Sequence, residues 1–235
     1  MRKEVIELDD LAQDLVAELD AETAFTIPIL GGIQVAESVV ITWLIMAALL
    51  ILSIIFVRNL KIKEAGRKQL LLEVAIDGMY RFFDDIMGPH GKKYIPYLCT
   101  VGIYIGVANL IGLIGFKPPT KDLGVTAALS VMSIILIEFA GIRQRGGKGW
   151  IKSLAEPVAI IAPLNVLEIF IRPLSLCMRL FGNVLGSFVV MELIKMVIPI
   201  VVPVPFSFYF DIFDGLLQAY VFVFLTSLFV REAIE

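Results

Sequence analysis

The sequence predicts an all-α, polytopic membrane protein with about five membrane-embedded helices, and three observations support this fold class. Of its 235 residues, 58% are hydrophobic and only 18% are charged, and the mean hydropathy is +0.88. A water-soluble domain of this composition would leave large apolar patches exposed. The hydrophobic residues also gather in runs as long as a bilayer-spanning helix, which needs about 20 residues. A soluble enzyme is therefore a poor explanation of the chain.

The first part of the chain differs from the rest in charge. Residues 1–37 hold nine acidic and two basic side chains, which predicts an acidic, partly helical leader outside the membrane. Residues 38–57 carry no charge and predict the first transmembrane helix. Basic residues follow at Arg58, Lys61 and Lys63, and such clusters mark the cytoplasmic end of a span. We therefore expect the N-terminus on the non-cytoplasmic side.

Two further segments continue this pattern. Residues 64–87 place apolar side chains at helical spacing among charged ones, which predicts an amphipathic helix on the membrane surface. An ordinary solvent-exposed linker helix is the alternative. Residues 94–142 predict a transmembrane hairpin, because two apolar runs flank the turn sequence KPPTKD. A second basic cluster, which includes Arg143 and Arg145, follows the hairpin and again indicates the cytoplasmic side.

The last segment, residues 157–231, predicts a long, tilted helical hairpin that turns at the sequence VPVPF. It is longer than perpendicular spans require, and it contains charged residues within its apolar runs. Its final helix returns the C-terminus to the cytoplasm. The chain shows no transit peptide, so we expect a multi-pass protein of a bacterial plasma membrane, with an organelle-encoded membrane protein as the alternative.

Arg179 is the most informative of these embedded charges. A charged side chain at the centre of the bilayer costs about 2.5–3.5 kcal/mol on insertion scales, so it requires a partner, a water-filled cavity or a function. Ser175 and Asn183 lie four residues to either side of Arg179, on the same helical face. Glu168 and Asp214 are candidate structural partners. Arg179 is therefore either a functional charge or one half of a buried ion pair.

The acidic residues of this hairpin suggest a polar path. Asp211, Asp214 and Gln218 follow the spacing i, i+3 and i+7, which predicts one polar stripe on the last helix. Such a stripe indicates the wall of a water path, with an ordinary polar seam between helices as the alternative. Glu192 faces nearly away from Arg179 on an ideal helix, and Lys195 is its candidate local partner.

Several kinds of soluble chemistry are poorly supported. His90 is the single histidine, which excludes a HExxH metal site, and Cys99 and Cys177 belong to no metal-binding cluster. No Walker, Rossmann or GxSxG pattern occurs. The charge balance also argues against a nucleic-acid partner. We therefore expect no bound cofactor, no metal and no nucleotide site on this chain.

Three sequence motifs resemble one protein family. They are RPLSLCMRLFGNVLG at 172–186, LQAYVF at 217–222 and PPTKDLGVTAAL at 118–129. Together they resemble subunit a of F-type ATP synthases, the stator half of a membrane ion channel, from about Thr42 to the end of the chain. The resemblance implies two offset half channels that load and unload the carboxylates of a rotor ring with H⁺ or Na⁺.

The resemblance also implies roles for individual residues. Arg179 takes the place of the family's essential arginine, which separates the two paths, and Gln218 takes that of a nearby glutamine. Where the family often has an acid or histidine, nine residues after the arginine, this chain has Phe188, so the role is expected one turn on at Glu192. The expected ion path comprises Glu192, Asp211, Asp214, Gln218, Asn183, Ser175 and Asp122.

The implied partners are the rotor c ring, the b subunits of the peripheral stalk and the lipid bilayer. Two other classes of protein are alternatives. A secondary cation transporter would usually show an internal repeat, and none is evident. A purely structural membrane scaffold would explain the helices, but it would not explain Arg179 opposite an acidic stripe.

Overall fold

The computed structural model describes residues 23–27, 33–58, 60, 66–153, 162–197 and 203–235. Within these ranges, five helical stretches are long and apolar enough to cross a membrane. The predicted fold class, an all-α polytopic membrane protein, is therefore confirmed. The five stretches are Glu37–Val57, Arg67–Ile114, Leu123–Trp150, Ala162–Lys195 and Pro203–Ile234.

The described end of the leader is not helical. Strands β1 (Thr23–Ile27) and β2 (Ile33–Ala36) pair antiparallel in a small two-stranded sheet. Both strands consist largely of β-branched and aromatic residues, which favour extended backbone. The described residues of the leader up to Ala36 are therefore extended, and residues 1–22, which the expectation of a partly helical leader also covers, lie outside the described part of the chain.

The next two helices each bury few residues. Helix α2 (Glu37–Val57) buries only Ile41 and Ile45, which pack on Ala108 and Ile111. Helix α3 (Arg67–Gly91) extends past the predicted end of the amphipathic segment and kinks at Gly88, where φ is 64°. Glycine allows this left-handed turn without a steric penalty, so the chain reverses there towards α4.

The remaining helices form the centre of the molecule. Helix α4 (Ile95–Leu110) and helix α5 (Leu123–Ser153) are joined by short 3₁₀ turns, η2 (Ile111–Ile114) and η3 (Pro119–Lys121). Helix α6 (Ala162–Val197) is the longest element. The chain then passes through α7 (Pro203–Ser207) and a π-helical segment, η5 (Phe208–Asp214), into α8 (Gly215–Ile234).

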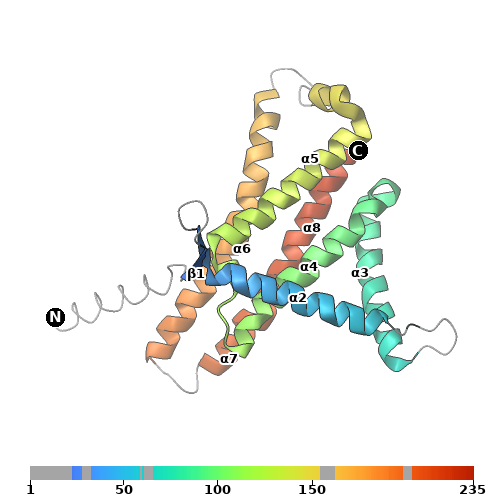
Figure 1. Ribbon diagram of the computed structural model, residues 1–235. Coiled ribbons are helices and arrows are strands. Elements are labelled where there is room, and N and C mark those ends of the chain that lie inside the picture. Colours follow the sequence, from blue (N-terminus) through green and yellow to red (C-terminus); the bar gives the residue numbers. More distant parts are fainter. Residues whose placement is uncertain (1–22, 28–32, 59, 61–65, 154–161, 198–202) are drawn as a thin grey trace.

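Helix α8 lies between α5 on one side and α3 and α4 on the other (Figure 1). Its closest approach to α4 follows a row of glycines. A Cβ atom added at Gly102 would lie 3.3 Å from Val223, and one added at Gly106 would lie 3.9 Å from Ala219. Small residues let two helix backbones come close together, which is how helices associate in lipid.

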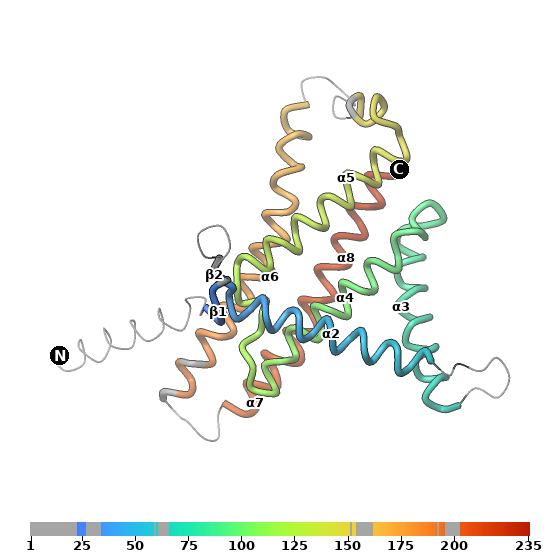
Figure 2. The backbone as a smooth tube through the Cα atoms, in the orientation of Figure 1, coloured from blue at the N-terminus to red at the C-terminus, as the bar shows by residue number. Residues whose placement is uncertain are grey.

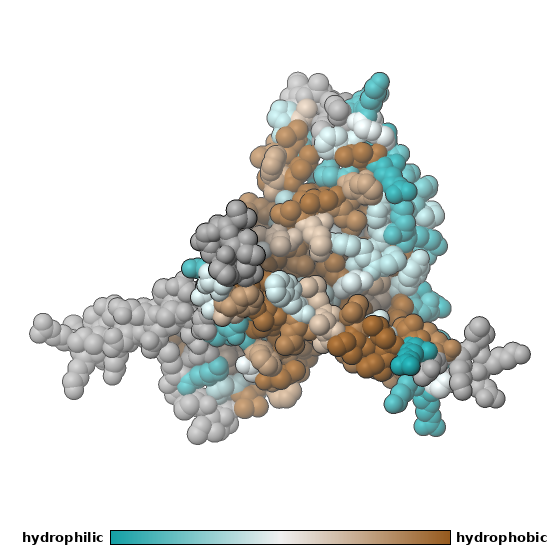
Figure 3. All heavy atoms as spheres, in the orientation of Figure 1, coloured by the Kyte–Doolittle hydropathy of each residue, from teal (hydrophilic) through white to brown (hydrophobic). Residues whose placement is uncertain are grey.

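The apolar core is formed where α3, α4, α5, α6 and α8 meet, and helix α2 crosses α4 obliquely (Figure 2). Side chains such as Phe83, Ile105, Ile137 and Leu180 are fully buried there. Large hydrophobic side chains also cover much of the outer face (Figure 3). Because lipid tails solvate apolar side chains, this exposed surface is typical of a membrane protein.

Candidate functional site

A partly open cavity of about 630 Å³, lined by apolar residues and by several polar and charged ones, lies at one end of α6 and α8. Three parts of the chain surround it: the segment from η2 to η3, the second half of α6, and the segment from α7 to the start of α8. Its polar and charged lining residues are Asn109, Lys117, Lys121, Ser187, Lys195, Ser207, Asp211 and Asp214. We call this space the polar cavity.

Two carboxylates of the predicted ion path line the polar cavity. Asp211 accepts a hydrogen bond of 2.5 Å from the hydroxyl of Ser207, the last residue of α7. Asp214 accepts longer hydrogen bonds, of 3.4 Å from Ser187 on α6 and 3.5 Å from the Gln218 amide. At these lengths the hydrogen bonds of Asp214 are weak. Within the described part of the chain, neither Asp211 nor Asp214 forms an ion pair.

The helix that carries these carboxylates is not regular. Asp211 and Asp214 belong to the π-helical segment η5, whereas Gln218 lies in the α-helical part of α8. The three residues of the predicted polar stripe therefore span the junction between a π-helical and an α-helical segment, and a π turn contains an extra residue. Short π-helical segments are frequent at functional sites.

Basic side chains also line the polar cavity. The spacing of charged residues along a single helix did not predict this. Lys121, in the turn η3, places its Nζ atom 3.4 Å from the ring centre of Phe188 on α6. This cation–π contact joins the two walls of the cavity. It shows that Phe188, where the family often has an ionisable residue, faces the same space as Asp211 and Asp214.

Asn109 is a cavity residue to which the sequence assigned no role. Its Nδ2 atom donates to the carbonyl oxygen of Gly215 at 2.8 Å, and its Oδ1 atom accepts from the Thr120 hydroxyl at 2.7 Å. Both Asn109 and Thr120 are buried. The sequence could have indicated Asn109, because it is a single asparagine in a largely apolar helix and a buried amide requires hydrogen-bond partners.

Arg179 lies on the outer face of α6, away from the core. The side chains of Leu176 and Leu180 on either side are buried, whereas Arg179 is exposed. Among the described residues, Arg179 makes no hydrogen bond or ion pair. Small or polar residues continue this face along the helix. A Cβ atom added at Gly182 or at Gly186 would meet no other atom within 4 Å. We call this face the α6 strip: Ser175, Arg179, Gly182, Asn183 and Gly186.

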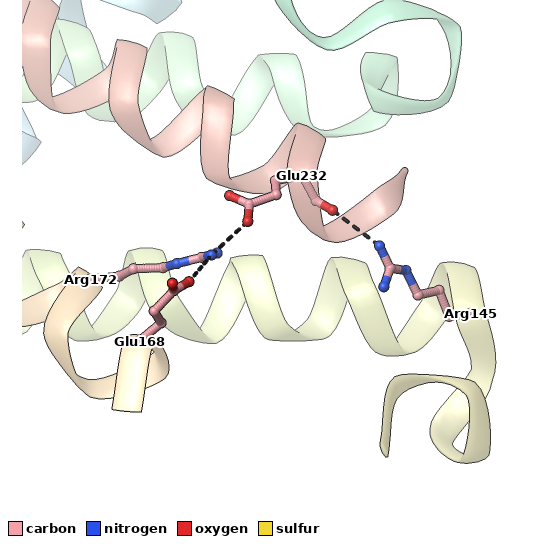
Figure 4. A network of polar contacts seen from close by, with 4 residues as sticks. All are labelled: Arg145, Glu168, Arg172 and Glu232. Carbon is pink, nitrogen blue, oxygen red and sulfur yellow. Dashed lines mark hydrogen bonds and ion pairs between the residues drawn. The ribbon is translucent and has the colours of Figure 1, made fainter. Parts of the chain in front are cut away.

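Glu168 does not serve as the partner of Arg179. It pairs with Arg172 at 2.7 Å, and Arg172 also pairs with Glu232 of α8 at 2.8 Å. Arg145 of α5 donates to the carbonyl oxygen of Glu232 at 3.2 Å. These four residues, the arginine–glutamate network, tie α5, α6 and α8 together (Figure 4).

The other predicted site residues lie in different surroundings. Asp122 caps the start of α5 by accepting from the Gly124 amide at 2.7 Å, and it also accepts from Ser38. It does not line the polar cavity. Gln218 is buried and contacts Asp214, and within the described residues no hydrogen bond joins it to Arg179. The side chain of Glu192 lies outside the described residues.

Comparison with known proteins places the chain in one family. The model of the ATP synthase A chain family matches residues 39–231. ATP synthase subunit a of Moorella thermoacetica is 38% identical over 208 residues, which cover 88% of this chain and 94% of that protein. A Pelobacter propionicus subunit a is 38% identical over 205 residues, covering 85% and 88% of the two chains.

A more distant relative gives the same result. A subunit a from a Bradyrhizobium species is 34% identical over 206 residues, which cover 87% of this chain and 92% of that protein. The region matched by the family model includes both the α6 strip and the polar cavity. The resemblance seen in the sequence is confirmed, and the chain belongs to the ATP synthase A chain family.

Proposed function

We propose that this chain is the ion-translocating stator subunit of a rotary F-type ATP synthase. In this role it provides two offset half channels, which load and unload the carboxylates of a rotor ring with H⁺ or Na⁺. The single observation that carries the proposal is Arg179, which is exposed on an apolar helix and has no partner among the described residues. A permanent charge at such a position is expensive unless an external group compensates it.

The shape of the α6 strip supports a helix of another subunit as the partner of Arg179. Gly182 and Gly186 leave open space beside Arg179, so another helix can approach closely. A rotor helix that presents a carboxylate there would compensate the guanidinium charge. Arginine remains protonated at physiological pH, so Arg179 acts as a fixed electrostatic barrier between two ion paths and not as a relay.

The polar cavity supports the entry path on the non-cytoplasmic side. Asp211 and Asp214 line it, and their hydrogen-bond partners are hydroxyl and amide groups that do not neutralise them. Water in this space would carry the ion past both carboxylates towards the rotor. Glu192 and the polar side chains of Asn183, Ser175 and Gln218 continue the proposed path, and we retain Asp122 as an outlying member.

The membrane potential drives the ion along this route. It contributes about 2.3 kcal/mol per elementary charge per 100 mV, so several ions must pass for each ATP made elsewhere in the complex. The proposed partners are therefore the rotor c ring at the α6 strip, the b subunits of the peripheral stalk and the lipid bilayer. The proposed location is a bacterial plasma membrane, with the N-terminus outside and the C-terminus inside. No cofactor is proposed on this chain.

The test is ATP synthesis by the whole complex in proteoliposomes. A pH gradient and a Na⁺ gradient are imposed separately, each with and without a protonophore. Synthesis that requires the pH gradient identifies H⁺ as the ion, whereas synthesis driven by Na⁺ that survives the protonophore identifies Na⁺. Arg179→Ala should abolish synthesis with either ion while the complex still assembles.

The matched control is Arg81→Ala, because Arg81 is an exposed arginine that pairs with Asp77 on α3. This variant should retain synthesis. Normal synthesis by Arg179→Ala would contradict the proposed channel. If Arg179→Ala and Arg179→Lys instead both prevented assembly, a structural scaffold would be the better explanation.

A further inference from the structure

The Asn109 side chain meets the end of the π-helical segment that carries Asp211 and Asp214. It connects three elements: Asn109 lies on α4, donates to the Gly215 carbonyl at the start of α8, and accepts from Thr120 in η3. Asn109 is 4% exposed and Thr120 is 0% exposed. Because Thr120 donates to Oδ1, the amide is oriented so that Nδ2 faces Gly215.

Gly215 is the residue at which the π-helical segment ends. Its amide N–H donates to the carbonyl oxygens of Phe210 and Ile212, and the bond to Phe210, five residues back, closes the last π turn. Its carbonyl oxygen receives the hydrogen bond from Asn109. The junction between η5 and α8 is therefore held on one side by the π turn and on the other by a buried side chain of another helix.

The contact between Asn109 and Gly215 is also unusually close. A Cβ atom added at Gly215 would lie 3.0 Å from the Cβ atom of Asn109. Gly102 and Gly106 of α4 face α8, and Gly215 of α8 faces Asn109 of α4. The hydrogen bond from Asn109 to the Gly215 carbonyl therefore forms where the two helix backbones are close. Any larger residue at 215 would push Asn109 away from the carbonyl.

A π turn is rare because its geometry is less favourable than that of the α-helix, so it persists where surrounding contacts hold it. Conversion of η5 to α-helix would shift Asp211 by one residue position around the helix axis, roughly 100°. Gln218 and the rest of α8, which are packed against α4 and α5, would stay in place. Asp211 would then turn away from the polar cavity.

We propose that Asn109 is a positioning residue, whose hydrogen bond to the Gly215 carbonyl holds the π turn and keeps Asp211 facing the polar cavity. Asn109 does not itself need to bind the ion. This inference rests on the proposed function only in assigning the orientation of Asp211 a role in ion transport. The orientation itself can be measured without ion transport.

The test measures the reactivity of a cysteine introduced at position 211 of the assembled complex. Asp211→Cys is made in a background in which Cys99 and Cys177 are replaced by alanine, and the rate of modification by a small, water-soluble methanethiosulfonate is followed by mass spectrometry. Adding Asn109→Leu, whose side chain has the same branching and number of heavy atoms but forms no hydrogen bond, should slow modification about tenfold, because one buried hydrogen bond biases such an equilibrium by up to about that factor.

Two controls separate orientation from general damage. Val184→Cys, on the α6 wall of the same cavity, should react at an unchanged rate in the Asn109→Leu background. Thr226→Val removes a buried hydroxyl that bonds only to Phe222 of its own helix, and it should leave the modification rate at position 211 unchanged. Asn109→Gln, which keeps an amide donor, should restore most of the rate.

If the Asn109→Leu complex does not assemble, Gly215→Ala gives an independent disturbance of the same contact and should also slow modification at position 211. An unchanged rate at that position in the Asn109→Leu background overturns the inference, whatever happens to ATP synthesis. An introduced cysteine that does not react even beside native Asn109 overturns it too. Failure of the proposed function is a different result, namely normal ATP synthesis by Arg179→Ala.

Discussion

Arg172 and Arg179 lie two turns apart on the same helix and have opposite surroundings. Arg172 makes ion pairs of 2.7 and 2.8 Å with Glu168 and Glu232 and lies 5.0 Å from the ring centre of Phe229. Arg179 is exposed on a strip of small and polar residues, with no partner among the described residues. An arginine thus forms ion pairs within the chain at position 172, whereas at position 179 its charge is exposed on the surface.

The acidic residues differ in the same way. Glu168 and Glu232 both form ion pairs with Arg172, whereas Asp211 and Asp214 take their hydrogen bonds from hydroxyl and amide groups beside a cavity. A carboxylate that is paired with arginine has little tendency to take up a cation. The arginine–glutamate network therefore maintains the arrangement of α5, α6 and α8, while the two aspartates remain available to an ion.

The largest effect is expected from changing the two arginines in turn. Arg179→Gln should lower gradient-driven ATP synthesis by at least about a hundredfold, because interactions with a charged partner contribute about 1.5–3 kcal/mol and a barrier to leakage is also lost. Arg172→Gln should retain a substantial rate. The rates are measured in proteoliposomes that contain equal amounts of assembled complex. Equal losses in the two variants would remove the distinction between the arginines.

A somewhat smaller effect is expected in the polar cavity. Asp211→Asn combined with Asp214→Asn should lower synthesis about ten- to hundredfold, since both ionisable groups are lost but the space remains. Ser207→Ala, which removes only the hydroxyl that bonds to Asp211, is the matched control and should change the rate far less. A double variant with the native rate would show that the ion does not pass these carboxylates.

A stability effect is expected from the arginine–glutamate network. Arg172→Leu leaves Glu168 and Glu232 without their shared partner, which should destabilise the packing of α6 on α8 by about 1–2 kcal/mol, less than a fully buried pair because both glutamates are exposed. The measurement is the temperature at which the subunit is lost from the purified complex. Arg81→Leu breaks an exposed pair on α3 and should change that temperature little.

The smallest effect is expected at the contact between Lys121 and Phe188. Phe188→Leu removes the ring beneath the lysine while preserving an apolar side chain, and a cation–π interaction of this kind contributes about 0.5–1 kcal/mol. ATP synthesis should therefore change no more than about fivefold. A loss as large as that of Arg179→Gln would mean that Phe188 has a role in the path beyond joining the cavity walls.

Some elements followed directly from the order of residues. Uncharged runs of bilayer length predicted the membrane helices, because the cost of placing charges and backbone polar groups in lipid leaves few alternatives. Arg179 was identified for the same reason. The strands β1 and β2 were not predicted, because two strands of five and four residues are too short to stand out within the acidic residues 1–37.

Other features depended on contacts between distant parts of the chain. Glu168 was a candidate partner for Arg179, but it pairs with Arg172, which also pairs with Glu232 of α8. Asp122 belongs to a motif of the family, yet its contacts are a helix cap and Ser38. The i, i+4 spacing of Glu168 and Arg172 is itself compatible with an ion pair. The contacts of Arg172 with Glu232 and of Asp122 with Ser38 cannot be found in this way, because they join residues on different elements.

The amino-acid sequence was enough to predict the membrane fold, the family and the charged residue on which the proposed function depends, because hydrophobic length and intramembrane charge are local properties with large energies. The three-dimensional structure was needed to show which charges are paired, where the polar cavity lies and that the last helix begins with a π turn beside Asn109. These outcomes depend on which side chains meet across α4, α6 and α8. Packing between helices resolves alternatives that differ by only one or two hydrogen bonds.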